Sequence, residues 1–78
     1  MTEDQKNELV NLGTECFGKL LNRNSYLSID VNHKRVLVED VDGFTQEYDL
    51  DSSDLHRAIS NEKGDVKKYL IRIKQILF

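Results

Sequence analysis

Residues 26–50, YLSIDVNHKRVLVEDVDGFTQEYDL, decide the fold of this chain. Leu27 and Ile29 alternate with polar residues, and two later stretches, residues 35–39 and 44–50, alternate in the same way. A period of two is typical of a half-buried strand, because successive side chains point to opposite faces of a sheet. The sequence therefore predicts a three-stranded antiparallel meander.

The hairpin between the second and third strands has two candidate registers. A two-residue turn at residues 42–43 would place both valines of the second strand on the acidic side of the sheet. A three-residue loop at residues 41–43, with Gly43 in the left-handed conformation, avoids this. It pairs Val38 with Gln46 and gathers most large apolar side chains on one face. Since a one-residue slip reverses every side chain, we expect the three-residue loop.

Helices are predicted before and after the meander. Residues 2–22 begin with a capping box, Thr2 with Gln5, and continue with apolar residues spaced three and four apart. These apolar positions are Leu9, Gly13, Cys16, Phe17, Leu20 and Leu21. Gly13 lies among them, so a neighbouring element is expected to approach the helix closely there.

Two further helices are expected after the meander. Asp51 or Ser52 can cap a short helix, and Asp65 can cap a longer one. The longer helix has the clearest apolar stripe, which comprises Val66, Tyr69, Leu70, Ile73, Ile76 and Leu77. The predicted class is α+β, in the order α-β-β-β-α-α, with the helices packed on one face of the sheet.

The length of the chain and its single cysteine indicate the number of domains and the cellular compartment. With 78 residues, the chain is expected to form a single small globular domain over residues 1–78. Cys16 is the only cysteine, so no disulfide framework can form, and its place on the apolar stripe predicts a core residue. The first eight residues are polar, unlike a signal peptide, and no apolar run approaches the ~20 residues that span a bilayer. We expect a cytoplasmic protein with no membrane partner.

No catalytic or cofactor-binding pattern is recognised. His33 and His56 have no second histidine or cysteine at ligand spacing, so no zinc site is expected. Residues 38–49 match a calcium-binding loop only in part, because Val38 and Asp49 stand where the motif needs Asp and Glu. We therefore expect no metal, no cofactor and no enzymatic activity.

Charge is distributed unevenly along the chain, whose net charge is −3. Between Val36 and Leu55 there are seven carboxylates and no basic residue. The candidate partner-binding residues are Asp30, Glu39, Asp40, Asp42, Glu47 and Asp49. They form either a solvated face that keeps the protein in solution or a surface for a basic partner. Carboxylates on residues i and i+2 of one strand are ~7 Å apart, and neighbouring strands are ~4.8 Å apart. An acidic face with these spacings can imitate a row of phosphates.

The leading hypothesis is a non-enzymatic protein-binding module. Such a module would inhibit or regulate a larger basic or nucleic-acid-binding protein, and is of the kind that phages and other mobile elements encode. The alternative is a small nucleic-acid-binding domain that uses the basic last helix. In that case Lys63, Lys67, Lys68 and Arg72 would contact phosphates, and affinity would fall steeply with salt.

The topology is similar to that of one known family, the double-stranded RNA-binding domain, which also runs helix, three strands, helix. That family contacts phosphates through a lysine cluster at the start of its last helix. The resemblance covers most of the chain and implies such contacts for Lys63, Lys67 and Lys68. The acidic meander, the additional short helix and the negative net charge depart from the family's pattern, so its function is not carried over.

Some apolar residues fall outside the predicted core. Tyr26 and Leu37 lie on the outer face of the predicted sheet, and Ile71 and Phe78 lie beside the main stripe of the last helix. Single exposed apolar residues are normal in monomers, but a group of them also suits self-association. Both a monomer and a homodimer through Leu37, Ile71 and Phe78 are compatible with the sequence.

Overall fold

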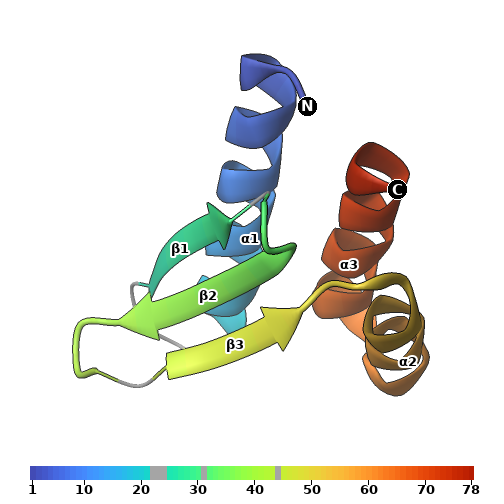
Figure 1. The fold of residues 1–78 in the computed structure, drawn as a ribbon. Coiled ribbons are helices and arrows are strands. Elements are labelled where there is room, and N and C mark those ends of the chain that lie inside the picture. The colour runs from blue at the N-terminus through green and yellow to red at the C-terminus, as the bar shows by residue number, and fades with distance from the viewer. Residues whose placement is uncertain (22–24, 31, 44) are drawn as a thin grey trace.

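The computed structural model describes residues 1–21, 25–30, 32–43 and 45–78. Its helices and strands are α1 (Glu3–Leu21), β1 (Ser25–Asp30), β2 (Arg35–Asp40), β3 (Thr45–Asp49), α2 (Ser52–Asn61) and α3 (Gly64–Leu77) (Figure 1). The predicted α+β class and the order α-β-β-β-α-α are confirmed. Predictions made for Phe44, and for the side chains of Leu20, Leu21 and Asp40, lie outside the described residues.

The sheet has the predicted register. The strand order is β1-β2-β3 and both pairings are antiparallel. Val36 lies opposite Tyr48 and Val38 opposite Gln46. Gly43 has a φ of 83°, in the left-handed region that glycine adopts without a steric penalty. Val36 and Val38 therefore point toward the helices, as expected, and Leu37 lies on the opposite face.

The termini of the helices show which predicted caps form. The Thr2 N–H donates to Gln5 Oε1 at 2.9 Å, and the Gln5 N–H donates to Thr2 Oγ1 at 3.1 Å, which confirms the capping box of α1. Asp51, one of two candidate caps, accepts from the N–H of Asp54 at 2.9 Å and caps α2. The expected cap Asp65 is wrong, because α3 begins earlier, with Lys63 at the N-cap position.

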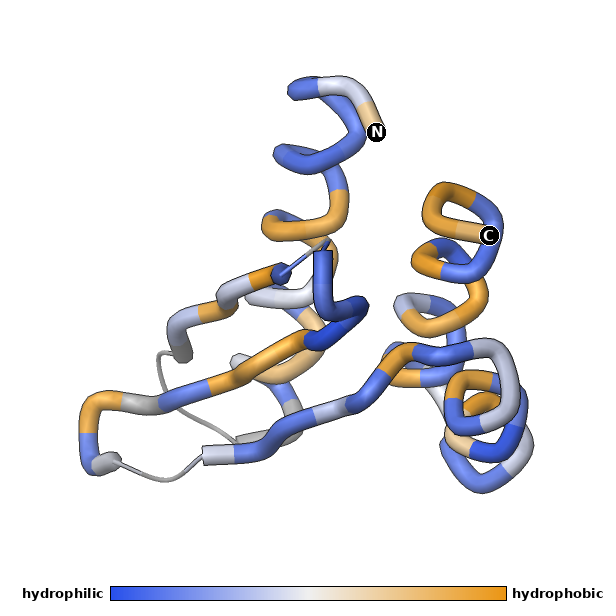
Figure 2. Tube along the Cα trace, viewed as in Figure 1, coloured by the Kyte–Doolittle hydropathy of each residue, from blue (hydrophilic) through white to orange (hydrophobic). Residues whose placement is uncertain are grey.

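The helices lie on one side of the sheet and leave the other side uncovered. In Figure 1, α1 passes behind β1 and β2, with α3 beside it. α1 contacts β1 and α3, and α2 contacts α3 and β3. Figure 2 shows that hydrophobic residues concentrate in β2 and α3, whereas β3 and the first turns of α1 are largely hydrophilic. Within the described residues, no helix combines the length and the apolar character that crossing a membrane requires.

The core joins α1, the inner face of the sheet, α2 and α3. Its largest fully buried side chains are Tyr69, Phe17, Leu9, Leu50, Leu55, Leu70, Ile73, Val36 and Val38. Phe17 packs against Tyr48 and Tyr69, with ring centroids 5.7 and 5.8 Å away. The close approach expected at Gly13 is present, because a β-carbon there would lie 2.5 Å from Leu27 Cδ2 and 2.9 Å from Tyr69 Cζ.

Candidate protein-binding face of the sheet

The uncovered side of the sheet, called the outer face below, consists of three rows of cross-strand neighbours. All of its members are exposed. The rows, each running from β1 through β2 to β3, are Tyr26 with Glu39 and Thr45, Ser28 with Leu37 and Glu47, and Asp30 with Arg35 and Asp49. The outer face thus combines carboxylates, one guanidinium group and two large apolar side chains.

The structure brings together most of the predicted partner-binding residues. Asp30, Glu39, Glu47 and Asp49 lie on the outer face. Asp42 is exposed in the turn that follows β2, beyond the paired rows. The side chain of Asp40 lies outside the described residues.

Arg35 is a member of this face whose role was not expected from the sequence. On the central strand it lies between Asp30 and Asp49, and its Nη1 is 3.3 Å from Glu47 Oε1. The predicted alternation of β2 already places Arg35 outward, and this is the signal that could have identified it. Ion pairs between exposed side chains contribute at most about 1 kcal/mol, so a partner can displace this one. Arg35 nevertheless reduces the negative charge of the row it occupies.

Asp30 is also engaged within the molecule. Its Oδ1 accepts from the His33 N–H at 3.1 Å, and its Oδ2 lies 2.7 Å from His33 Nδ1. Both hydrogen bonds lower the pKa of Asp30 from its usual value, and the bond from the His33 backbone N–H has the larger effect. Lys34, the next residue, has a φ of 52° and places its Nζ 4.5 Å from the centre of the Phe78 ring. Lys34 is thus directed toward the end of α3, and Arg35 is the basic side chain that lies among the carboxylates at this end of the outer face.

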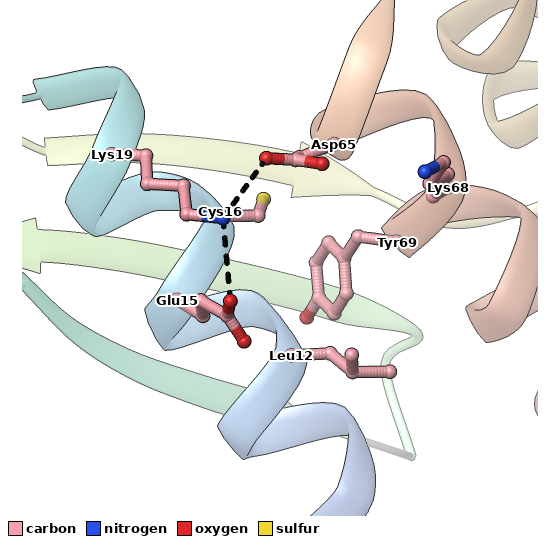
Figure 3. Close-up of a pocket in the computed structure, with 7 residues that line it drawn as sticks. All are labelled: Leu12, Glu15, Cys16, Lys19, Asp65, Lys68 and Tyr69. Atoms are coloured by element: carbon pink, nitrogen blue, oxygen red, sulfur yellow. Dashed lines mark ion pairs between the residues drawn. The ribbon is translucent and has the colours of Figure 1, made fainter.

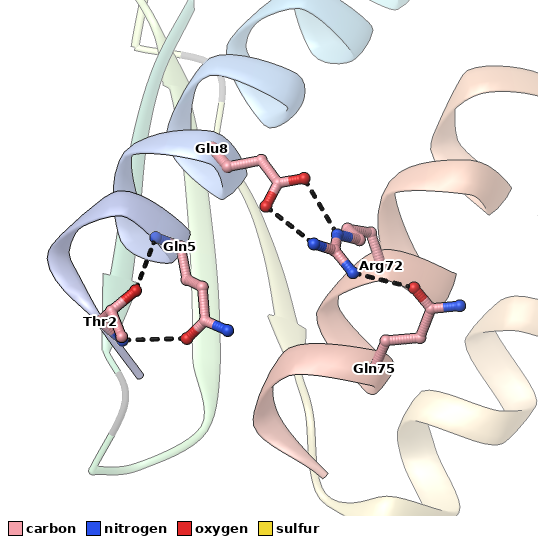
Figure 4. A network of polar contacts seen from close by, with 5 residues as sticks. All are labelled: Thr2, Gln5, Glu8, Arg72 and Gln75. Atoms are coloured by element: carbon pink, nitrogen blue, oxygen red, sulfur yellow. Dashed lines mark hydrogen bonds and ion pairs between the residues drawn. The ribbon is translucent and has the colours of Figure 1, made fainter.

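One of the candidate nucleic-acid-binding residues, Arg72 of α3, is engaged in a contact within the molecule. Arg72 binds Glu8 of α1 through two hydrogen bonds of 3.0 Å, and its Nη1 donates to Gln75 at 3.2 Å (Figure 4). The hydrogen bond to Glu8 raises the pKa of Arg72, and the bond to Arg72 lowers the pKa of Glu8. Lys67 and Lys68 are exposed. Arg72 thus links two helices and is not available as a phosphate contact without breaking that link.

A pocket of about 130 Å³ lies between α1 and α3 (Figure 3). It is lined by Leu12, Glu15, Cys16, Lys19, Asp65, Lys68 and Tyr69. Lys19 is 3.3 Å from Glu15 and 3.5 Å from Asp65, so most of the charged rim is paired internally. Cys16 is buried, as predicted, and burial raises the pKa of its thiol to about 11. At neutral pH the thiol is therefore protonated and is a poor nucleophile.

One arrangement that could hold a cation was not expected from the sequence. Asp49, Asp51 and Asp54 offer carboxylate oxygens that all lie within 4.8 Å of one another. Two of these groups already have structural roles, since Asp51 caps α2 and Asp54 lies 3.8 Å from Arg57. The geometry is accounted for by the start of the helix.

The apolar residues considered for self-association lie on two different elements. Leu37 is on the outer face, whereas Ile71 is on α3 and Phe78 is its C-cap. All three are exposed, but the Phe78 ring is partly occupied by Lys34.

Comparisons with protein families, with curated proteins and with solved structures find no match for this chain.

Proposed function

We propose that this chain is a non-enzymatic protein-binding module that inhibits or regulates a larger protein through the outer face of its sheet. The observation that carries the proposal is that the helices cover only one side of the sheet. The uncovered side presents Leu37 at its centre and Tyr26 at its edge, and four carboxylates lie on the same face. An apolar centre with a polar rim is the usual composition of a protein–protein interface.

Charge complementarity indicates the class of partner. Four carboxylates and one guanidinium group leave the outer face with net negative charge, so its partner is a basic protein surface. A nucleic-acid-binding protein has such a surface. Imitation of a row of phosphates is part of this proposal, but Arg35 separates Asp30 from Asp49, and Leu37 lies at the centre of the outer face. A basic surface with an apolar contact of its own therefore fits better than a groove that accepts only phosphates.

The proposed setting is the cytoplasm, because the one cysteine is a buried free thiol. An origin in a phage or another mobile element belongs to the same proposal, and motivates a search for the partner in a bacterial host. Binding of nucleic acid by α3 is less favoured, because Arg72 is already held by Glu8.

The test is capture of proteins from a host lysate by three matched baits. The baits are the wild type, Glu39→Lys with Glu47→Lys on the outer face, and Lys67→Glu with Lys68→Glu on α3. We expect a basic protein that the wild type and the α3 variant capture equally and that the outer-face variant does not capture. Added duplex nucleic acid should compete for that protein.

Two results would contradict the proposal. One is equal capture of the same proteins by all three baits. The other is salt-sensitive binding of the wild type to duplex DNA or RNA that disappears in the α3 variant, which would establish the nucleic-acid alternative. Circular dichroism of each bait verifies that loss of capture does not reflect unfolding.

A further inference from the structure

The two ends of the outer face differ in how their carboxylates are satisfied. Toward the β1–β2 turn, Asp30 is bound by His33, and Arg35 stands between Asp30 and Asp49. Toward the β2–β3 hairpin, Glu39 forms no hydrogen bond or ion pair within the part of the chain that the structure describes. The Asp49 carboxylate likewise forms no hydrogen bond or ion pair with the described residues, but it lies directly opposite Arg35. Glu39 is therefore the unengaged carboxylate of the outer face that has no basic cross-strand neighbour.

Apolar side chains flank this carboxylate. Tyr26 lies directly opposite Glu39 across the β1–β2 ladder, and Leu37 is two residues along β2 on the same face. Cross-strand neighbours have β-carbons about 4.5–5.5 Å apart, and diagonal neighbours about 7–8 Å apart. Tyr26 is 65% exposed and Leu37 is 37% exposed, so a ligand can reach both side chains. These three residues are called the hairpin corner below.

We infer that the hairpin corner binds an arginine side chain of the partner protein. The inference rests on the proposed function and names the chemical group that the outer face recognises. A guanidinium group matches a carboxylate in a planar, two-bond geometry, which Glu39 can supply. Its face stacks on an aromatic ring, which Tyr26 offers, and its aliphatic stem lies on apolar surface such as Leu37.

The same ligand does not suit the other end of the face. Arg35 already occupies the position between Asp30 and Asp49, and a second guanidinium group there would meet like charge. Lysine is a weaker ligand for the hairpin corner, because an ammonium group is compact and strongly hydrated and cannot form the planar pair.

The test uses a minimal probe, the peptide acetyl-Gly-Arg-Gly-amide, titrated into the ¹⁵N-labelled chain and followed by NMR. We expect saturable shifts of the amides of residues 26–28 and 37–39, with a dissociation constant of about tens of millimolar. The lysine peptide should bind about two- to fivefold more weakly, because an ammonium group cannot form the planar two-bond pair with Glu39. The citrulline peptide, which has the same shape without the charge, should give no saturable shift.

Variants assign the contact to individual residues. Glu39→Gln should abolish the saturable shifts. Tyr26→Leu should weaken binding of the arginine peptide about two- to fivefold, the difference that an exposed cation–π contact makes. Glu3→Gln is the matched control, because it removes an exposed carboxylate from the first turn of α1 and not from the outer face, and it should leave the titration unchanged. Shifts centred on Asp30 and Asp49, equal affinity of the arginine and citrulline peptides, or no saturable shift at about 100 mM would overturn the inference.

This outcome is separable from that of the proposed function. If Glu39→Lys with Glu47→Lys abolishes capture of a basic protein but the arginine peptide does not bind, the inference falls and the proposed function stands. If the arginine peptide binds at the hairpin corner but the variant still captures the same proteins, the proposed function falls and the corner remains an arginine site.

Discussion

Replacing Gly13 with alanine tests the packing that fixes the sheet against α1. An alanine β-carbon would lie 2.5 Å from Leu27 Cδ2, 2.9 Å from Tyr69 Cζ and 3.0 Å from the Tyr69 hydroxyl oxygen. Carbon atoms in contact are normally about 3.5–4.0 Å apart, so the new atom would overlap both side chains. Leu27 can change rotamer, but the Tyr69 ring is 2% exposed and packs edge-on against Phe17.

Two opposing energies decide the size of the effect. Alanine is favoured over glycine in a helix interior by about 0.8–1.0 kcal/mol. Forcing an additional carbon into a packed core costs about 1–3 kcal/mol. Because a leucine rotamer cannot relieve the contact with the Tyr69 ring, the upper part of that range applies. The free energy of unfolding should therefore fall by roughly 1–2 kcal/mol, which lowers Tm by about 4–16 °C in a domain of this size.

The assay is urea unfolding followed by far-ultraviolet circular dichroism. Thr14→Ala is the matched control, because Thr14 is exposed on the same helix and its replacement changes helix propensity alone. The control should raise the free energy of unfolding by a few tenths of a kcal/mol. A Gly13→Ala variant that is more stable than the wild type would show that α1 and β1 do not approach each other closely at this position.

Three further outcomes follow from single contacts. Tyr69→Phe should raise the free energy of unfolding by about 1 kcal/mol in urea titrations, because the buried Tyr69 hydroxyl has no hydrogen-bond partner among the described residues. A lower free energy of unfolding would mean that this hydroxyl binds a buried water molecule. Asp51→Ala should lower the free energy of unfolding by about 1 kcal/mol, and Asp51→Asn, which keeps the acceptor, should lower it much less; equal losses would contradict the cap. Burial raises the pKa of Cys16 from 9.0 to about 11 and that of Tyr48 from 10.0 to about 12, so folding favours their neutral forms. The stability that these two groups contribute is present below their unfolded pKa values and is lost as pH rises through their folded pKa values. The urea concentration at the unfolding midpoint should therefore decrease as pH is raised from 9 to 12. The decrease should be smaller in the double variant Cys16→Ala with Tyr48→Phe.

The strands were predictable because their side chains alternate around one apolar face. Only one hairpin register buries Val36 and Val38 together, and the structure has that register. The start of α3 was less predictable, since a local pattern at Asp65 cannot distinguish an N-cap from a first-turn acid. In the structure Asp65 lies inside the helix and pairs with Lys19 of α1.

Contacts between distant segments were not predictable from local patterns. Glu8 and Arg72 are 64 residues apart, and only the packing of α1 against α3 brings them together. The candidate face was predictable in outline, because strand period placed four carboxylates outward. The pairing of Glu47 with Arg35 was not predicted, because Arg35 lies just before the acidic stretch in the sequence. The side chains of Glu47 and Arg35 nevertheless project from the same face of the sheet.

The most direct test of the central claim is the affinity of the purified partner for two charge-reversed variants, measured by isothermal titration calorimetry. Once capture has identified the partner, Glu39→Lys with Glu47→Lys should weaken its binding by about a hundredfold or more, because like charges face each other across the interface. Lys67→Glu with Lys68→Glu should change the dissociation constant by no more than about twofold, since exposed pairs outside an interface contribute little. The opposite ranking, or equal affinity of both variants and the wild type, would contradict the assignment of the outer face as the binding surface.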